Sequence, residues 1–131
     1  MGTRGAFGIE NPDGTVSAVY CGHDSYPSHA GDILLTHYNT EEKFRALLAL
    51  GDMSSVGATL DTTEDYHRTA GEPYDDVKPR IFKDVSDYCA NGFEVMDAAY
   101  LYLLSESTWF VSSRRGADPQ PLTRDMISAD N

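Results

Sequence analysis

The pair Asp13-Gly14 constrains the fold of this chain more than any other local feature. Asp-Gly readily adopts the positive φ angles of a tight hairpin turn, and segments 6–10 and 15–21 on either side suit β-strands. Along 15–21 alternate residues suit two different faces, so we expect one face to pack inward while the other stays partly wet. The sequence therefore predicts an N-terminal β-hairpin.

Two short helices are predicted to follow this hairpin. Ser28 suits the N-cap of a helix that runs to about His37. Asn39 or Thr40 suits the cap of a second helix, which carries an apolar stripe at helical spacing and ends at Gly51. We expect this helical pair to pack on the hairpin.

Residues 57–79 show no hydrophobic periodicity and contain two prolines and two glycines. We therefore predict a long acidic loop inside the domain. Its carboxylates are Asp61, Glu64, Asp65, Glu72, Asp75 and Asp76. One explanation is a solvated loop. The other is a partner-binding segment, in which Tyr66 and Tyr74 add stacking planes among the charges.

The second half of the chain predicts a smaller set of elements. We expect a short strand around Ile81, a helical turn that begins after Asp84 and ends near Gly92, and a second hairpin with strands at 100–104 and 109–111.

Together these elements predict an α+β fold in one domain over residues 1–116, with 117–131 as a polar tail. We expect a small antiparallel sheet made of the N-terminal and C-terminal hairpins. Two or three short helices should pack on one face of it.

The formal net charge of −11 argues against direct nucleic-acid binding, because phosphate backbones repel such a surface. A solubility surface and an anionic face for a basic partner both explain this charge. No apolar run approaches the roughly 20 residues of a membrane span, and we find no secretory signal pattern. We expect a cytoplasmic protein without membrane association, in which Cys21 and Cys89 are reduced, buried thiols.

His23-Asp24 offers metal-ligand chemistry, with His29 and His37 nearby. However, eight residues separate His29 from His37, about 12 Å along a straight helix, so a single ion cannot bridge them. We predict no metal site and no cofactor.

Catalytic signatures are also missing from the sequence. Cys21, His23 and Asp24 resemble the parts of a nucleophilic site, but no evident third group orients the histidine. The sequence has no Gly-x-Ser-x-Gly, glycine-rich phosphate loop or His-Glu-x-x-His motif. We therefore predict that the protein is not an enzyme.

Three residues near the N-terminus suit either structural or ligand-binding roles. Arg4 can hold an anionic ligand or pair with one of the many carboxylates of this chain. Asp24 and Tyr26 suit a corner between a strand and a helix, and they also suit contacts with a ligand or partner.

The first third of the chain contains five distinctive segments in a fixed order. They are Gly2-Thr3-Arg4, Val19-Tyr20-Cys21, Asp24-Ser25-Tyr26-Pro27, Gly31-Asp32-Ile33-Leu34-Leu35 and Leu50-Gly51-Asp52-Met53-Ser54-Ser55. In this order they resemble a family of small acidic phage and prophage proteins, whose members begin Gly-Thr-Arg and carry a Tyr-Cys-His-Trp-Asp-Gly-Tyr segment. The resemblance covers residues 2–57 and, weakly, the strand Trp109-Phe110-Val111. Where the family has Cys-His-Trp-Asp, this chain reads Cys21-Gly22-His23-Asp24, so Asp24 matches and the histidine does not.

This resemblance implies a phage-encoded inhibitor of bacterial antiviral defence, similar to anti-CRISPR proteins, that acts in the cytoplasm of the host cell. The expected partner is a host defence complex with a basic nucleic-acid-binding surface, which the acidic segment 61–76 contacts by mimicking nucleic acid. Two alternatives stay open. One is a self-associating structural or regulatory phage protein. The other is a sponge for a nucleotide immune signal, with a pocket lined by Arg4, Asp24, Tyr26 and Trp109.

Overall fold

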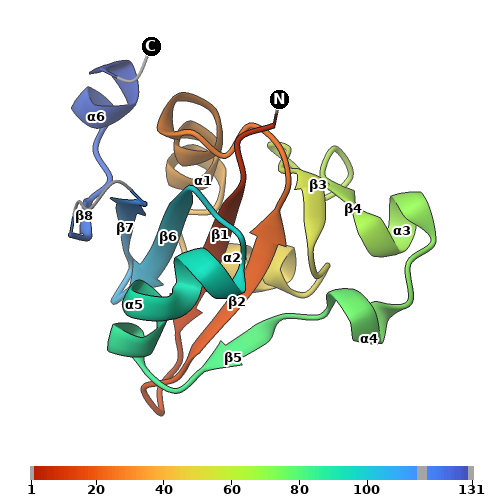
Figure 1. Cartoon of the computed structure of the whole chain (residues 1–131). Coiled ribbons are helices and arrows are strands. Elements are labelled where there is room, and N and C mark those ends of the chain that lie inside the picture. Colours follow the sequence, from red (N-terminus) through yellow and green to blue (C-terminus); the bar gives the residue numbers. More distant parts are fainter. Residues whose placement is uncertain (1, 115–117, 130–131) are drawn as a thin grey trace.

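The computed structural model describes residues 2–114 and 118–129 and shows a mixed β-sheet between two helical layers (Figure 1). The strands are β1 (Gly5–Glu10), β2 (Val16–Cys21), β3 (Met53–Ser55), β4 (Glu64–Asp65), β5 (Arg80–Phe82), β6 (Tyr100–Ser105), β7 (Thr108–Ser113) and β8 (Gln120–Pro121). The helices are α1 (Asp32–His37), α2 (Glu41–Leu48), α3 (Tyr66–Ala70), α4 (Tyr74–Val77), α5 (Val85–Val95) and α6 (Arg124–Ala129), and a π-helical turn, η1 (Pro27–Gly31), leads into α1. Within the described ranges, none of the helices has the length and apolar character needed to cross a membrane.

Both predicted hairpins are confirmed, and they use different turns. In the β1–β2 turn, Gly14 adopts a φ of 90°. In the β6–β7 turn, Glu106 and Ser107 adopt φ angles of 49° and 66° without any glycine. Two consecutive positive φ angles are the signature of a tight hairpin turn, so the second hairpin forms despite an unfavourable turn sequence.

The α+β class is confirmed, but the sheet is neither small nor purely antiparallel. It has eight strands in the order β4-β3-β2-β1-β6-β7-β8, with β5 also paired to β2. The two hairpins join through a parallel β1–β6 pair, with Phe7 opposite Tyr102. This direction follows from α5, because the β5–α5–β6 crossover returns the chain parallel to β1, whereas a short loop would have reversed it.

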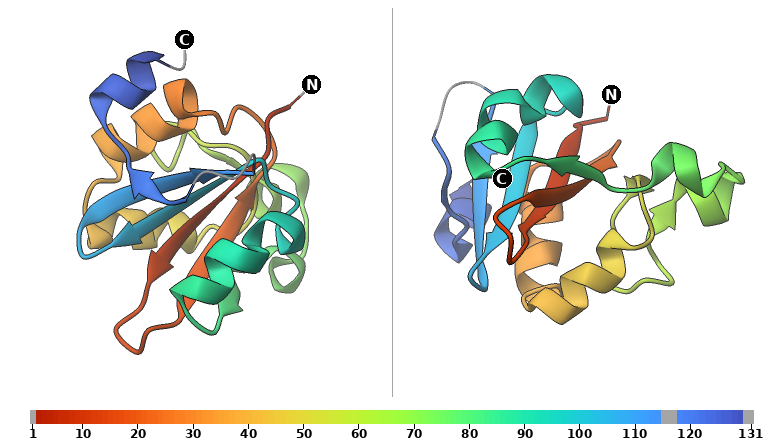
Figure 2. Two further views of the ribbon diagram at one scale, coloured as in Figure 1. Left: turned by 60° about the vertical axis from the view of Figure 1, so that its left-hand side comes forward. Right: turned by 90° about the horizontal axis from the view of Figure 1, so that it is seen from below.

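Helices cover both faces of the sheet, so the prediction of helices on one face holds for the pair at 29–50 and misses α5. η1, α1, α2 and α6 lie on one side and α5 on the other (Figure 2). The reason is visible in the strands, where Phe7 and Ile9 enter the larger core while Ala6 faces the core under α5. Alternate residues of β2 and β6 divide in the same way, so neither face of the central strands stays wet.

The local details of two of the three predicted helices differ from expectation. The first helix begins at Pro27, and no side chain caps it, whereas Ser28 was expected to be the cap. Of the two candidates for the next cap, Thr40 is the one that accepts a hydrogen bond, from the backbone N–H of Lys43. Helix α5 continues through Gly92 to Val95. A Cβ at Gly92 would lie 3.0 Å from Cδ1 of Leu101, so close packing, not helix termination, explains this glycine.

Residues 57–79, which we call the acidic arm, are not an irregular loop. They contain β4, α3 and α4 and project from the body of the protein (Figures 1 and 2). Hydrogen bonds order this segment where a hydrophobic pattern is missing. For example, Asp65 caps α3, and the Tyr74 hydroxyl donates to the carbonyl of Ala49 at 2.8 Å.

The segment expected to be a polar tail also differs from that description. It contains β8, which pairs with β7, and α6, which packs near η1. Leu122 and Ile127 are buried in the larger core. Residues 117, 130 and 131 of the predicted tail lie outside the described residues.

Candidate functional site

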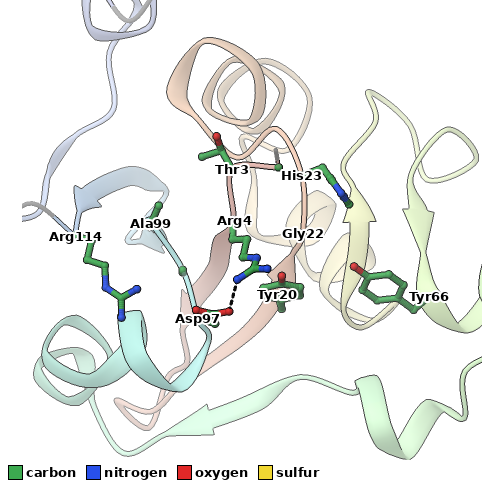
Figure 3. Close-up of a pocket in the computed structure, with 11 residues that line it drawn as sticks. Thr3, Arg4, Tyr20, Gly22, His23, Tyr66, Asp97, Ala99 and Arg114 are labelled. Atoms are coloured by element: carbon green, nitrogen blue, oxygen red, sulfur yellow. Dashed lines mark hydrogen bonds and ion pairs between the residues drawn. The ribbon is translucent and has the colours of Figure 1, made fainter.

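A pocket of about 720 Å³ opens at one end of the central strands, where β1 and β6 begin and β2 and β7 end (Figure 3). Four chain segments meet there because the parallel strands β1 and β6 start at this end of the sheet and their antiparallel neighbours β2 and β7 finish at it. The first residue of α3 in the acidic arm, Tyr66, forms a further wall. The polar side chains of this pocket therefore come from distant parts of the sequence.

Arg4 and Asp97 form an ion pair inside this pocket. Arg4 Nη1 lies 2.5 Å from Asp97 Oδ2, and the Arg4 carbonyl accepts the backbone N–H of Ala99 at 2.7 Å. Asp97 adopts a φ of 52°, the left-handed region, between α5 and β6. Both side chains are more than half exposed, so exchange of the carboxylate for another anion costs little free energy.

Arg114 reaches the same pocket from the end of β7. Its backbone N–H donates to the carbonyl of Ala99 at 2.9 Å, which fixes the base of the side chain. Its guanidinium is exposed and has no ion pair or hydrogen bond with any residue in 2–114 or 118–129. Figure 3 shows Asp97 between Arg114 and Arg4.

Two tyrosines form the other side of the pocket. Tyr20 comes from β2 and Tyr66 from α3, and Gly22 lies between them. A Cβ at Gly22 would lie 2.7 Å from the hydroxyl oxygen of Tyr66 and 3.5 Å from the Tyr20 ring. Phenol hydroxyls are protonated at neutral pH, and burial raises the pKa of both tyrosines further, so both can donate hydrogen bonds.

His23 separates this pocket from a neighbouring one of about 530 Å³ that Asp24, Ser54 and Ser55 line. Its Nδ1 lies 3.2 Å from both the carbonyl oxygen and the hydroxyl oxygen of Ser54. These contacts tie the imidazole to β3. In the described ranges, His, Cys, Asp and Glu side chains form no group of three that could hold a metal ion.

The nucleophile hypothesis for Cys21 and His23 lacks the required geometry. The Cys21 thiol contacts the backbone carbonyl of His23, not its ring, at 3.5 Å. Burial raises the pKa of this thiol, which disfavours the reactive thiolate. Both cysteines are free, with Cys21 buried and Cys89 half-buried.

The four ligand residues predicted from the sequence do not share a pocket. Arg4 lines the larger pocket and Asp24 the smaller one. Tyr26 is half-buried and packs near His29. Trp109 is buried in the larger core, where its indole N–H donates to the carbonyl of Tyr38 at 3.0 Å. Its place in β7 faces the helices, so Trp109 cannot line either pocket.

One of the six acidic arm residues is structural. Asp65 is fully buried, accepts the backbone N–H of Arg68 at 3.1 Å, and pairs with the Arg68 guanidinium at 2.5 Å. Asp75 lies 3.8 Å from Lys78 in an exposed pair. The exposed carboxylates are Asp61, Glu64, Glu72, Asp75 and Asp76.

Sequence reasoning missed Tyr20, Tyr66, Asp97 and Arg114 as pocket residues. One signal was available, because Arg114 and Arg115 are adjacent arginines in a strongly acidic chain. No local pattern marks the other three. Comparisons with protein-family models, curated proteins and solved structures find no match for this chain.

Proposed function

We propose that the protein is a stoichiometric inhibitor of a bacterial nucleic-acid-handling defence complex, which it binds through the acidic arm. The observation that carries this proposal is that contacts within the protein itself hold the arm in a defined shape. A solvated connection has no need of the contacts that hold α3 and α4 in place. A rigid array of carboxylates, in contrast, can enter a basic groove without a large ordering cost.

Three sets of contacts support this rigidity. Asp65 and Arg68 lock the start of α3, and Arg68 Nη2 also donates to the carbonyl of Leu60 at 2.6 Å. Tyr74 joins α4 to the end of α2 through the Ala49 carbonyl. The Tyr74 ring packs edge-on against His67, with ring centroids 5.6 Å apart, which connects α3 to α4.

The charge balance of the arm supports the same proposal. Residues 57–79 contain six acidic residues and two basic ones, Arg68 and Lys78, which gives a net charge of −4. Arg68 is committed to buried Asp65, so its charge is compensated locally. Exposed carboxylates therefore dominate the projecting surface, which suits a partner that otherwise binds phosphates.

The test is capture of the defence complex on immobilised protein, followed by elution with increasing salt. We expect a basic, nucleic-acid-binding complex to elute as salt rises, because the contact is electrostatic and screened. We expect the double variant Asp75→Lys/Asp76→Lys to capture it much less. The variant Asp75→Asn/Asp76→Asn removes the charges with little change of shape and should give an intermediate loss.

A matched control carries the same change of charge elsewhere. Glu94 in α5 and Asp118 before β8 are exposed and lie outside the acidic arm, so Glu94→Lys/Asp118→Lys should bind as the wild type does. If both double variants weaken capture equally, the effect comes from the net charge of the protein and not from the acidic arm. Unchanged capture and inhibition by Asp75→Lys/Asp76→Lys would exclude the acidic arm as the binding surface.

A further inference from the structure

We propose that the pocket between Arg4 and Arg114 binds a small phosphorylated molecule with an aromatic ring, of about the size of a nucleoside monophosphate. This site lies at the ends of the central strands and would bind its ligand through positive charge, so it is separate from the carboxylates of the acidic arm. Its residues, apart from Tyr66, lie outside the acidic arm to which the inhibitor function is assigned.

The first argument is the state of the arginines. Four arginines outside the pocket each have a carboxylate partner: Arg45 with Glu41, Arg68 with Asp65, Arg80 with Asp52 and Arg124 with Asp32. Arg114 differs, because no residue in the described ranges pairs with its guanidinium. The Arg114 guanidinium is therefore available to an external anion, to which it can donate in a bidentate way.

The second argument is the position of Asp97. Its carboxylate holds the Arg4 guanidinium from a left-handed residue at the pocket wall, between the two arginines (Figure 3). Asp97 thus occupies a place that a ligand oxygen can take. The pocket carries two guanidinium charges against this one carboxylate, and a phosphate dianion balances both arginines once Asp97 is displaced.

The third argument is the size and chemistry of the remaining walls. A volume of about 720 Å³ lies within the range of small-molecule sites and far exceeds that of a phosphate ion. Tyr20 and Tyr66 supply aromatic surface and hydroxyl donors, and Ala98 and Ala99 form a small apolar part of the lining. Because Gly22 has no side chain, the space between the two tyrosines stays open.

The probes are 5′-AMP, adenosine and inorganic phosphate, each titrated into the full chain and followed by calorimetry and by amide chemical shifts. We expect 5′-AMP to bind saturably, with shifts at Arg4, Tyr20 and Ala99, and more tightly than either adenosine or phosphate. Arg114→Gln should weaken 5′-AMP binding roughly tenfold, since a charge-assisted hydrogen bond is lost. Arg45→Gln removes an arginine of α2 that does not line the pocket and should leave binding unchanged.

Asp97→Asn gives the sharper test. Asparagine has the same shape and tolerates a positive φ, so the turn between α5 and β6 should persist. The variant frees Arg4 from its carboxylate and should tighten 5′-AMP binding several-fold. Melting temperatures of all variants establish that they are folded.

Four results would overturn the proposal. The first is that 5′-AMP shows no saturable binding up to about 10 mM, a concentration far above the Kd of a specific site. The second is that Arg45→Gln and Arg114→Gln weaken 5′-AMP binding equally. The others are that adenosine binds as tightly as 5′-AMP, or that folded Asp97→Asn binds 5′-AMP more weakly than the wild type. Phosphate binding as tight as that of 5′-AMP would overturn the assignment of the aromatic part. Failure of these experiments leaves the inhibitor proposal untouched, because Asp75 and Asp76 lie outside the pocket.

Discussion

At the residue scale, the structure reassigns side chains whose chemistry suggested function. Trp109 suggested a ligand-stacking surface, but its neighbours make it a core residue. Its ring packs edge-on against Phe44 at a centroid distance of 5.0 Å, and its N–H satisfies the Tyr38 carbonyl. The sequence could not distinguish these roles, because a tryptophan in a strand suits both a buried core position and an exposed stacking surface.

Trp109→Phe should lower the free energy of unfolding by about 1–3 kcal/mol, since it removes packing volume and leaves the buried Tyr38 carbonyl without its donor. Urea denaturation followed by far-ultraviolet circular dichroism measures this change. Thr108→Ala, at an exposed position of the same strand, is the control and should change stability little. In the wild type, Trp109 is the only tryptophan, so its emission should be blue-shifted until the protein unfolds. Wild-type-like stability of the Trp109→Phe variant would contradict the core role.

At the element scale, the acidic arm shows how polar contacts order a segment that has no hydrophobic periodicity. Asp65 performs two tasks at once, because it caps α3 and neutralises Arg68 in a buried position. Thr63 adds a further tie, accepting the backbone N–H of Gly57 at 3.0 Å. Such side-chain contacts leave no repeating signature in the sequence, which is why the segment suggested a loop.

Asp65→Ala should loosen the acidic arm, because α3 loses its cap and Arg68 loses its buried partner. We expect faster amide hydrogen exchange across residues 64–78, with slower exchange retained in β1, β2 and β6. Exchange followed by mass spectrometry measures this, and Glu64→Ala is the control at the adjacent exposed position. Unchanged protection of α3 would show that Asp65 does not hold the arm.

At the scale of the whole molecule, a net charge of −11 opposes the compact state through self-repulsion. Asp52 adds to this cost. Burial raises its pKa despite the backbone N–H of Tyr20 and the Arg80 guanidinium, both of which act to lower it. A carboxyl whose pKa is higher in the folded than in the unfolded protein favours folding when protonated. This contribution is therefore lost as pH rises through the folded pKa.

Stability should accordingly increase as pH falls from 7 towards the ordinary aspartate pKa of about 4, because protonation relieves both the repulsion and the buried charge of Asp52. Hydrogen bonds lower the pKa of Asp13 and Asp87, so their stabilising effect is lost in stronger acid, and we expect stability to fall below about pH 4. Melting temperatures across this range measure the profile. Added salt should raise the melting temperature at pH 7 more than at pH 5. A melting temperature that falls steadily from pH 7 would contradict this account.

The sequence by itself determined the two hairpins, the helix that begins after Asn39 or Thr40 and the α+β class, because turn residues, caps and periodic apolar positions act within a few residues of one another. The tertiary structure decided the parallel β1–β6 pairing, the second helical layer and the ordered acidic arm. It also brought Arg4, Tyr20, Asp97 and Arg114 together at one end of the central strands. These features depend on the direction in which α5 returns the chain and on which face each strand presents to a neighbour. Such long-range choices are made by packing, and no local pattern records them.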